Sequence, residues 1–202
     1  MKETEVTVEV KESYETLKQK LTSQGFSCSK TFTMLDRYYS QISMERLQNR
    51  SFEQIISNSF LLRAINSKTD KDEDEINILL YKDKIFDEQG NVIEEEKVQT
   101  YIDNAEKHAE IFARAGFKPY ATIFSSNELL SNGKFELLIQ NVENLGLFIE
   151  FEEYDEIKHL SPKEKSSKLI SVLKGLGLNL GDDFNCKKLN LYIKQNNSPE
   201  PN

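Results

Sequence analysis

The sequence predicts one α+β domain built mainly from antiparallel strands, and three observations carry this prediction. The first segment, EVTVEVK at residues 5–11, alternates polar and β-branched residues, which is typical of a half-buried strand. Similar segments recur along the chain and bring the total to about eight strands. Stretches with apolar residues at helical spacing, each preceded by an N-cap signal, separate some of them. Strands in this number form a barrel or a sandwich, and alternation alone leaves both open.

Three helices are predicted in chain order. The first follows Ser13 as its N-cap and ends at Gly25, where the chain turns back toward the core. The second follows a capping box formed by Asp103 and Glu106. The third begins at Ser161, where the sequence SPKE supplies a cap, a first-turn proline and a closing glutamate.

The remaining strands are predicted from their alternating or β-branched segments. They span residues 32–39, 60–65, 76–82, 97–102, 121–130, 134–140 and 147–153. Two charged stretches between them, residues 68–75 and the acidic run Glu94–Glu96, are predicted to be solvated. We expect a single domain over residues 1–195 and a disordered polar tail over residues 196–202.

Composition excludes several function classes. The 202 residues carry a formal net charge of −8, whereas nucleic-acid binding relies on a surplus of exposed Lys and Arg. Cys28 and Cys186 are far apart and are predicted to be free thiols of a reducing compartment, with one disulfide as the alternative. The sequence has no signal-peptide pattern and no apolar run of roughly 20 residues. We therefore expect a cytoplasmic protein without membrane or nucleic-acid partners.

Several predicted strands place Glu, Lys and Arg on one parity and apolar residues on the other. Such strands either surround a polar cavity with their charged faces or direct these faces to solvent in a sandwich. The two arrangements are equally compatible with the periodicity. A cavity lined by both signs of charge would suit a polyanion and its metal ion.

The order of five short motifs resembles one family over nearly the whole chain. The motifs are EVTVEVK (residues 5–11), LDRYYS (35–40), FLLRA (60–64), LLYKDK (79–84) and FELLIQNVENLGLFIEFEEY (135–154). Together they resemble the CYTH family of triphosphate tunnel metalloenzymes, which includes class IV adenylyl cyclases and thiamine triphosphatases. The resemblance implies a closed eight-stranded antiparallel β-barrel with flanking helices and a charged tunnel.

The resemblance also implies site residues. The bases that match the family pattern are Lys11, Arg63 and Lys82, which would act in catalysis and bind the substrate, with Lys97 as a further substrate-binding residue. The matching metal ligands are Glu9, Glu150 and Glu152, which would hold Mg²⁺ or Mn²⁺. The implied ligand is a small triphosphate compound: ATP, tripolyphosphate or thiamine triphosphate.

The chain also departs from the family pattern. Thr7 replaces a glutamate of the opening motif, and Glu5 on the same face would have to take over its role from nearly 7 Å along the strand. Neutral Ser125 and Asn127 stand where the family has a Lys-x-Arg pair, and Gln140 stands where it has an acid. Further departures are Gln99 and the pair Lys188-Leu189.

Two functions therefore remain open. The first is a class IV cyclase, which converts ATP to cyclic AMP and pyrophosphate, or a triphosphatase, in which water attacks the terminal phosphate. The second is a polyphosphate- or nucleotide-binding module without turnover, because catalysis of this kind depends on positioning and charge stabilisation. The protein would be a monomer or a homodimer in either case.

Overall fold

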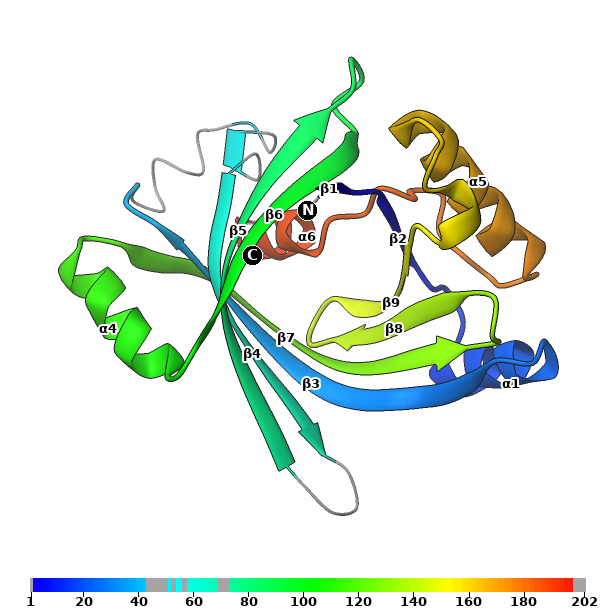
Figure 1. Cartoon of the computed structure of the whole chain (residues 1–202), viewed down its shortest axis with the longest axis horizontal. Helices are drawn as coiled ribbons and strands as arrows, with labels where there is room; N and C mark the ends of the chain where they lie inside the picture. Colours follow the sequence, from blue (N-terminus) through cyan, green and yellow to red (C-terminus); the bar gives the residue numbers. More distant parts are fainter. Residues whose placement is uncertain (1, 43–50, 52–53, 56–57, 69–72, 198–202) are drawn as a thin grey trace, which may run out of the picture.

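The computed structural model describes residues 2–42, 51, 54–55, 58–68 and 73–197. They form one antiparallel sheet that curls around a central opening, with helices around it (Figure 1). The strands are β1 (Lys2–Glu3), β2 (Glu5–Glu9), β3 (Ser27–Ser40), β4 (Asn58–Lys68), β5 (Glu73–Phe86), β6 (Val92–Ile102), β7 (Lys118–Ser131), β8 (Glu136–Val142) and β9 (Gly146–Glu152). The helices are α1 (Tyr14–Ser23), α4 (Ala105–Arg114), α5 (Pro162–Gly175), α6 (Lys188–Asn197) and the 3-10 turn η1 (Asp155–Ile157). The predicted α+β class is confirmed.

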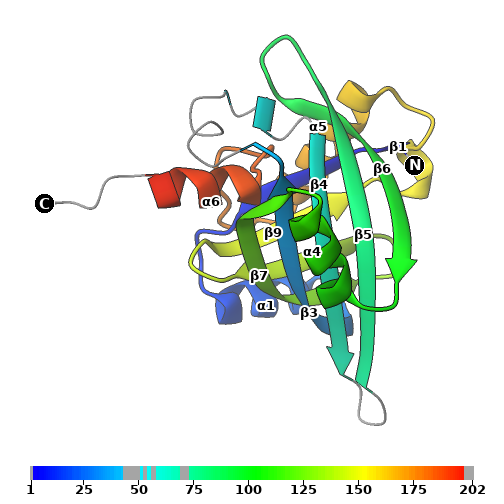
Figure 2. The same ribbon diagram turned by 90° about the vertical axis from the view of Figure 1, so that its left-hand side faces the viewer.

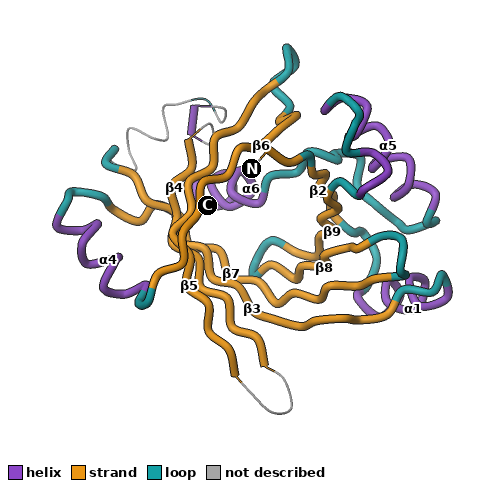
Figure 3. Tube along the Cα trace, in the orientation of Figure 1, coloured by secondary structure: helices purple, strands orange, loops and turns teal. Residues whose placement is uncertain are grey.

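The N-terminal segment joins the two ends of the curled sheet (Figure 3). The strand order is β1-β6-β5-β4-β3-β7-β8-β9-β2, so the outermost strands are consecutive in the chain and separated only by Thr4. β1 pairs with β6 through Glu3 and Glu95, and β2 pairs with β9 from Glu5 opposite Glu152 onward. Counted as one interrupted strand, β1 and β2 complete the eight-stranded barrel that the family resemblance implies.

The larger apolar core lies on the outer face of one side of the barrel. Val6 and Val8 of β2 point outward and pack with Leu17 of α1 and Leu169 of α5, and all four are at most 2% exposed. The alternation predicted for β2 is therefore correct, with its valines facing the helices. This arrangement directs the polar parity of the strand inward.

Both helices begin at the N-caps that the sequence predicts. Ser13 caps α1 by accepting a hydrogen bond from the backbone N–H of Thr16. Ser161 and Glu164 form the capping box of α5, with Pro162 in the first turn. The hairpin between β8 and β9 turns at Gly146, whose φ of +112° favours glycine.

A smaller apolar core fills one end of the barrel interior, and α6 covers it. Leu61, Leu80 and Phe148 point inward there and pack with Leu189 of α6. Seen down the barrel, α6 lies across the opening, and the side view places it at one end (Figures 1 and 2). This helix was not predicted, because its apolar residues are sparse and no capping signal precedes it.

Helix α4 packs on the outer face of β3 and β4 (Figure 2). Phe112 of α4 contacts the ring of Tyr39 on β3 and that of Phe60 on β4, with ring centroids 5.2 and 4.7 Å apart. The predicted capping box of this helix is wrong by one residue, since Asn104 is the N-cap. Asparagine caps as well as aspartate does, so both residues satisfied the sequence signal.

Three local expectations need correction or lie outside the described residues. The acidic run Glu94–Glu96 belongs to β6, and Glu95 is 2% exposed, so it is not a solvated run. In the predicted loop at 68–75, β5 already begins at Glu73, and residues 69–72 are not described. Helix α6 continues to Asn197, and residues 198–202 of the predicted tail are not described. Among the described residues, no helix has the length and apolar composition needed to cross a bilayer.

Candidate functional site

Beyond the apolar end, the barrel encloses a charged cavity of about 220 Å³. The side chains that surround it come from seven strands and from the segment that leads into α6. Its charged and polar lining consists of Glu5, Thr7, Asp36, Arg63, Lys82, Lys84, Lys97, Gln140, Glu150, Glu152, Lys187 and Lys188. The polar parity of the strands therefore faces an interior, which decides the question that the periodicity left open.

Arg63 of β4 is fixed by a carboxylate on the neighbouring strand. Its Nε and one of its terminal nitrogens donate to the two carboxylate oxygens of Asp36, each at 2.7 Å. The two residues face each other in the β3–β4 register. Burial alone would lower the pKa of Arg63, but Asp36 outweighs it and holds this pKa above the ordinary value. The guanidinium therefore carries its charge into the cavity in a fixed orientation.

Lys82 and Lys84 of β5 share one buried carboxylate, that of Glu95 on β6. The Nζ of Lys82 lies 3.0 Å from a Glu95 oxygen, and Lys84 pairs with the other oxygen. Burial, aided by nearby Arg63 and Lys97, lowers the pKa of Lys82 to about 8. Burial and the neighbouring lysines lower the pKa of Lys84 to about 6. Burial and mutual repulsion thus disfavour the charged forms of these lysines, and an anion in the cavity would favour them.

Lys97 of β6 lies between the bases and the acids. Its Nζ is 2.7 Å from Glu3 and 3.6 Å from both Glu5 and Glu95. Burial would lower its pKa, but Glu5 and Glu3 outweigh burial and raise it. Lys97 is therefore charged, and it bridges the two sides of the cavity where the barrel closes between β1 and β6.

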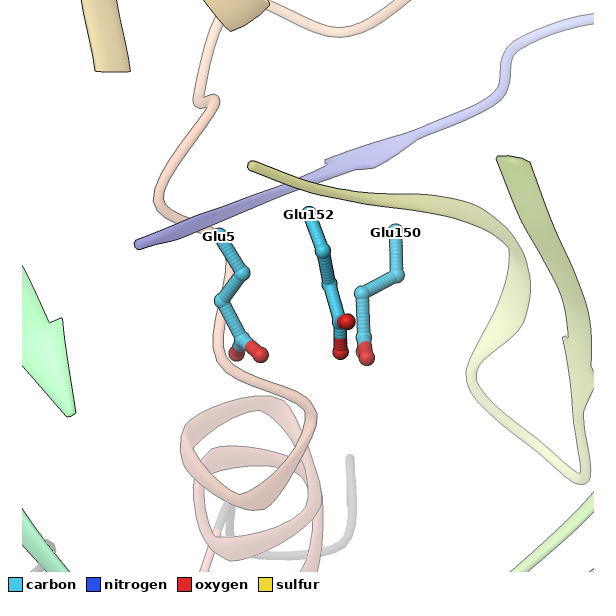
Figure 4. A group of neighbouring side chains, drawn as sticks. All are labelled: Glu5, Glu150 and Glu152. Atoms are coloured by element: carbon cyan, nitrogen blue, oxygen red, sulfur yellow. The ribbon is translucent and has the colours of Figure 1, made fainter. Parts of the chain in front are cut away.

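Three carboxylates meet on the opposite side. Glu5 of β2 and Glu150 and Glu152 of β9 each present an oxygen, and these oxygens all lie within 4.8 Å of one another. Figure 4 shows the three side chains pointing the same way, above the start of α6. Glu150 and Glu152 share a face because they are two residues apart on one strand, and Glu5 is directly opposite Glu152 in the β2–β9 register.

The carboxylates have different electrostatic surroundings. Burial raises the pKa of Glu5, but Lys187 and Lys97 outweigh it and bring the pKa well below the ordinary value. Burial also acts on Glu150, and Lys188 outweighs it, so its pKa is lowered. Glu152 is the more exposed member, yet desolvation of its carboxylate, with Glu150 and Glu5 nearby, raises its pKa to about 7. Negative charge is thus concentrated at this point.

The donor set fits a hard divalent cation. Magnesium and manganese prefer carboxylate oxygens, and a triphosphate supplies further oxygens of the same kind. Glu5, Glu150 and Glu152 each offer one carboxylate oxygen, and these three oxygens lie within 4.8 Å of one another. Desolvation, with repulsion from Glu150 and Glu5 in addition, raises the pKa of Glu152, and a cation at the cluster would favour its charged form.

The cavity side formed by β8, and the buried polar residues of β7 behind it, carry no charge. Asn127 donates to the hydroxyl oxygen of Ser125 at 3.1 Å, and Gln140 donates to the side-chain oxygen of Asn127 at 3.1 Å. All three are at most 3% exposed. The three departures from the family pattern on these strands therefore satisfy one another, and the Gln140 oxygen accepts from Lys188.

The structure brings together five of the residues predicted for the site. Arg63, Lys82, Lys97, Glu150 and Glu152 all line the cavity.

The other two predicted residues, Glu9 and Lys11, do not line this cavity. They pair with each other, and their side chains are 40% and 49% exposed. Gly181 donates its N–H to the carbonyl of Glu9 at 2.8 Å, so the chain before α6 packs against this stretch. Glu5, four residues before Glu9 on the same strand, takes the acidic position in the cavity.

Four cavity residues, and one partner of the lining lysines, were not predicted for the site: Asp36, Lys84, Lys187 and Lys188, and the partner Glu95. Lys84 shares the parity of Lys82, so the alternation of β5 contained a signal for it. The roles of Asp36 and Glu95 depend on their pairing with bases on neighbouring strands, which the local sequence does not predict. Lys187 and Lys188 come from a segment for which no element was predicted, and Lys188 was noted only as part of a departure from the family pattern.

The closed barrel and its charged lining define the class of protein as a tunnel-type β-barrel whose interior carries both bases and carboxylates. No protein-family profile matches the chain. A Methanocaldococcus jannaschii protein named "Putative adenylate cyclase" is 31% identical over 109 residues. The match spans 54% of this chain and 60% of that relative, which is less than two thirds of its length.

Solved structures share the fold over almost the whole chain. A Pyrococcus horikoshii protein aligns with a TM-score of 0.71 at 21% identity and covers 96% of this chain and 99% of its own. A Hippeastrum protein, named as a putative adenylyl cyclase with a dominant triphosphatase activity, aligns with a TM-score of 0.61 at 14% identity, covering 96% of each chain. At these identities the likeness shows the fold. The shared fold agrees with the barrel that the motif resemblance to the CYTH family implies.

Proposed function

We propose that the chain binds a linear triphosphate compound together with Mg²⁺ or Mn²⁺ in the barrel cavity and cleaves it. The observation that carries the proposal is the division of the cavity into a basic wall and a carboxylate cluster. The bases Arg63 and Lys82 line the same cavity as the cluster of Glu5, Glu150 and Glu152. Lys97 lies between the two groups, with its Nζ 3.6 Å from Glu5. A triphosphate carries several negative charges in a row, and bases in a water-poor cavity bind it more strongly than bases on a surface.

Each group has a defined task in the cleavage. Asp36 holds Arg63 through Nε and one terminal nitrogen, so the remaining terminal N–H groups of the guanidinium would donate to phosphate oxygens from a fixed orientation. Lys82 and Lys97 offset charge that develops on the leaving phosphate. Glu5, Glu150 and Glu152 would hold the divalent cation, which supplies Lewis-acid polarisation of the phosphate when bound. The catalysis is thus positioning and charge stabilisation by groups already in place.

The size of the cavity favours hydrolysis of a compact polyanion over cyclisation of ATP. Its volume of about 220 Å³ is below the roughly 300 Å³ at which pockets for drug-sized ligands begin. The phosphate chain fits inside, while a nucleoside would extend beyond the enclosed part. The name of the Hippeastrum relative, which combines a cyclase with triphosphatase activity, is consistent with either reaction.

A turnover assay tests the proposal. The protein is incubated with tripolyphosphate, ATP or thiamine triphosphate in Mg²⁺ or Mn²⁺, and phosphate, pyrophosphate and cyclic AMP are quantified. We expect phosphate release from tripolyphosphate to exceed cyclic AMP formation from ATP. Arg63→Gln should lower turnover at least about tenfold, because a bidentate phosphate contact is lost. The control Arg114→Gln, an exposed arginine paired with Glu110, should leave it unchanged. Absence of product with all three compounds would contradict the proposed cleavage.

The second candidate function is binding without turnover. The observation that favours it is the neutral network of Ser125, Asn127 and Gln140, which replaces two bases and an acid of the family pattern. In that case tripolyphosphate with Mg²⁺ would raise the melting temperature while no product forms. A ligand at one hundred times its dissociation constant stabilises the folded state by about 2.7 kcal/mol, which is readily measured.

A further inference from the structure

The segment that leads into α6 delivers two lysines to the carboxylate cluster. The Nζ of Lys188 lies 2.9 Å from Glu150 Oε2, and the Nζ of Lys187 lies 3.5 Å from Glu5 Oε1. Their side chains are 20% and 10% exposed. Two of the three carboxylates that would hold a divalent cation are therefore paired with cations of the chain itself.

The backbone fixes this delivery. Cys186 donates its N–H to the carbonyl of Thr7 at 3.0 Å, and the N–H of Thr7 donates to the carbonyl of Phe184 at 3.2 Å. The segment is thus attached to β2 between Glu5 and Glu9, and the next two residues enter the cavity. Lys188 is also the first residue of α6, where the helix dipole disfavours a cation, so helix stability does not explain this lysine.

Local charge does not allow the carboxylates to be paired with the lysines and with a divalent cation at the same time. The three carboxylates carry up to three negative charges, and Lys187, Lys188 and the nearby Lys97 balance them. A divalent cation on the cluster would leave an excess of positive charge in a partly buried site. Opposite charges must compensate such an excess because the cost of unpaired buried charge is high.

We propose that Lys187 and Lys188 exchange partners: they neutralise the carboxylate cluster in the metal-free protein and bind the phosphates once the metal ion occupies the cluster. This inference rests on the proposed function and specifies how metal and polyanion are coupled in it. The two lysines thereby supply, from the C-terminal segment, cationic groups that Ser125 and Asn127 do not provide on β7. Lys188 is joined to these positions through Gln140, which accepts from Lys188 and donates to Asn127.

The exchange predicts opposite effects of one substitution on two ligands. Lys188→Met removes the competitor for Glu150, so Mn²⁺ alone should bind several-fold more tightly. The same variant removes a phosphate-binding cation, so tripolyphosphate in the presence of Mg²⁺ should bind at least about tenfold more weakly. A lysine with a purely structural role would not tighten metal binding when it is removed.

The experiment measures Mn²⁺ binding by electron paramagnetic resonance of the free ion and tripolyphosphate binding by calorimetry. Lys165→Met is the matched control, because Lys165 forms a part-buried pair with Glu153 at 2.8 Å outside this cluster. It should change neither affinity. Lys188→Arg keeps the charge and should stay near wild type in both titrations, which separates the exchange from misfolding.

The outcomes separate the two proposals. Tighter Mn²⁺ binding with weaker tripolyphosphate binding in Lys188→Met supports the exchange. If wild type binds both ligands and Lys188→Met changes neither, or weakens both, the exchange is overturned while the proposed function stands. If wild type binds neither Mn²⁺ nor tripolyphosphate, the proposed function and the exchange fail together.

Discussion

The two charged walls of the cavity differ in how their charges are compensated. On the β4–β5–β6 wall, Arg63 and Lys82 pair with Asp36 and Glu95, acids held by adjacent strands of the same sheet. On the β2–β9 wall, the carboxylates are compensated mainly by lysines from a separate segment of the chain. The first kind of pairing is part of the barrel's construction, whereas the second can be exchanged for a ligand without breaking the sheet.

The charge pairs on the basic wall are therefore expected to stabilise the fold, and the carboxylates on the other wall to bind the metal ion. Removing an acid from the basic wall leaves buried lysines uncompensated and should cost stability. Removing an acid from the carboxylate wall should mainly cost metal binding, because the lysines there come from outside the sheet. The following substitutions test this division, from the largest expected effect to the smallest.

Glu95→Gln should have the largest effect on folding. It removes the carboxylate that pairs with Lys82 and Lys84, and unfolding free energy should fall by about 3–5 kcal/mol, as when one partner of a buried pair is removed. Chemical denaturation measures this. Glu96→Gln, the exposed neighbour in the same acidic run, is the control and should change stability by less than about 0.5 kcal/mol. Equal effects of the two substitutions would show that Glu95 is not a structural partner.

Glu152→Gln should have a large effect on metal binding and a small one on folding. Glu152 is the exposed member of the cluster, so its loss should change stability little. Its loss as a ligand should weaken Mn²⁺ binding at least about tenfold, since even outer-shell partners of metal sites contribute 10–100-fold. The exposed Glu156 provides the control Glu156→Gln. Unchanged Mn²⁺ affinity in Glu152→Gln would remove Glu152 from the proposed metal site.

The smallest expected effect concerns the alkylation rates of the two cysteines. Cys28 is exposed, whereas Cys186 lines the cavity and is 7% exposed. Burial first, and Asp183 and Glu9 in addition, raise the pKa of Cys186 to about 11. Because the thiolate is the reactive form, alkylation of Cys186 should be much slower than that of Cys28 at pH 7.5. Its rate should rise about tenfold per pH unit up to about pH 11.

Mass spectrometry of the alkylated peptides measures both rates. Tripolyphosphate with Mg²⁺ should slow Cys186 further, because a filled cavity restricts access, and should leave Cys28 unchanged. Equal protection of both thiols would point to a general effect on the protein and not to occupancy of the cavity.

The family resemblance of the sequence implied the barrel and much of one wall, whereas alternation alone left a barrel and a sandwich open. The period of two in β2, the caps of α1 and α5, and the Arg63 and Lys82 parities all depend on local patterns that the structure keeps. The register of β2 could not be predicted, because Glu5 and Glu9 share one parity and only the pairing with β9 and with residues 179–186 selects Glu5. Burial of Glu95 and the entry of Lys187 and Lys188 depend on contacts between strands and segments far apart in the chain.

The central claim is that this cavity binds a triphosphate together with a divalent cation. Calorimetric titration of tripolyphosphate into the wild-type protein, in Mg²⁺ and then in EDTA, tests it most directly. We predict saturable binding in Mg²⁺ that is at least about tenfold weaker in EDTA, because the cation neutralises the carboxylates and releases cations for the phosphates. Absence of binding in both buffers, or equal affinity in the two, would contradict the claim.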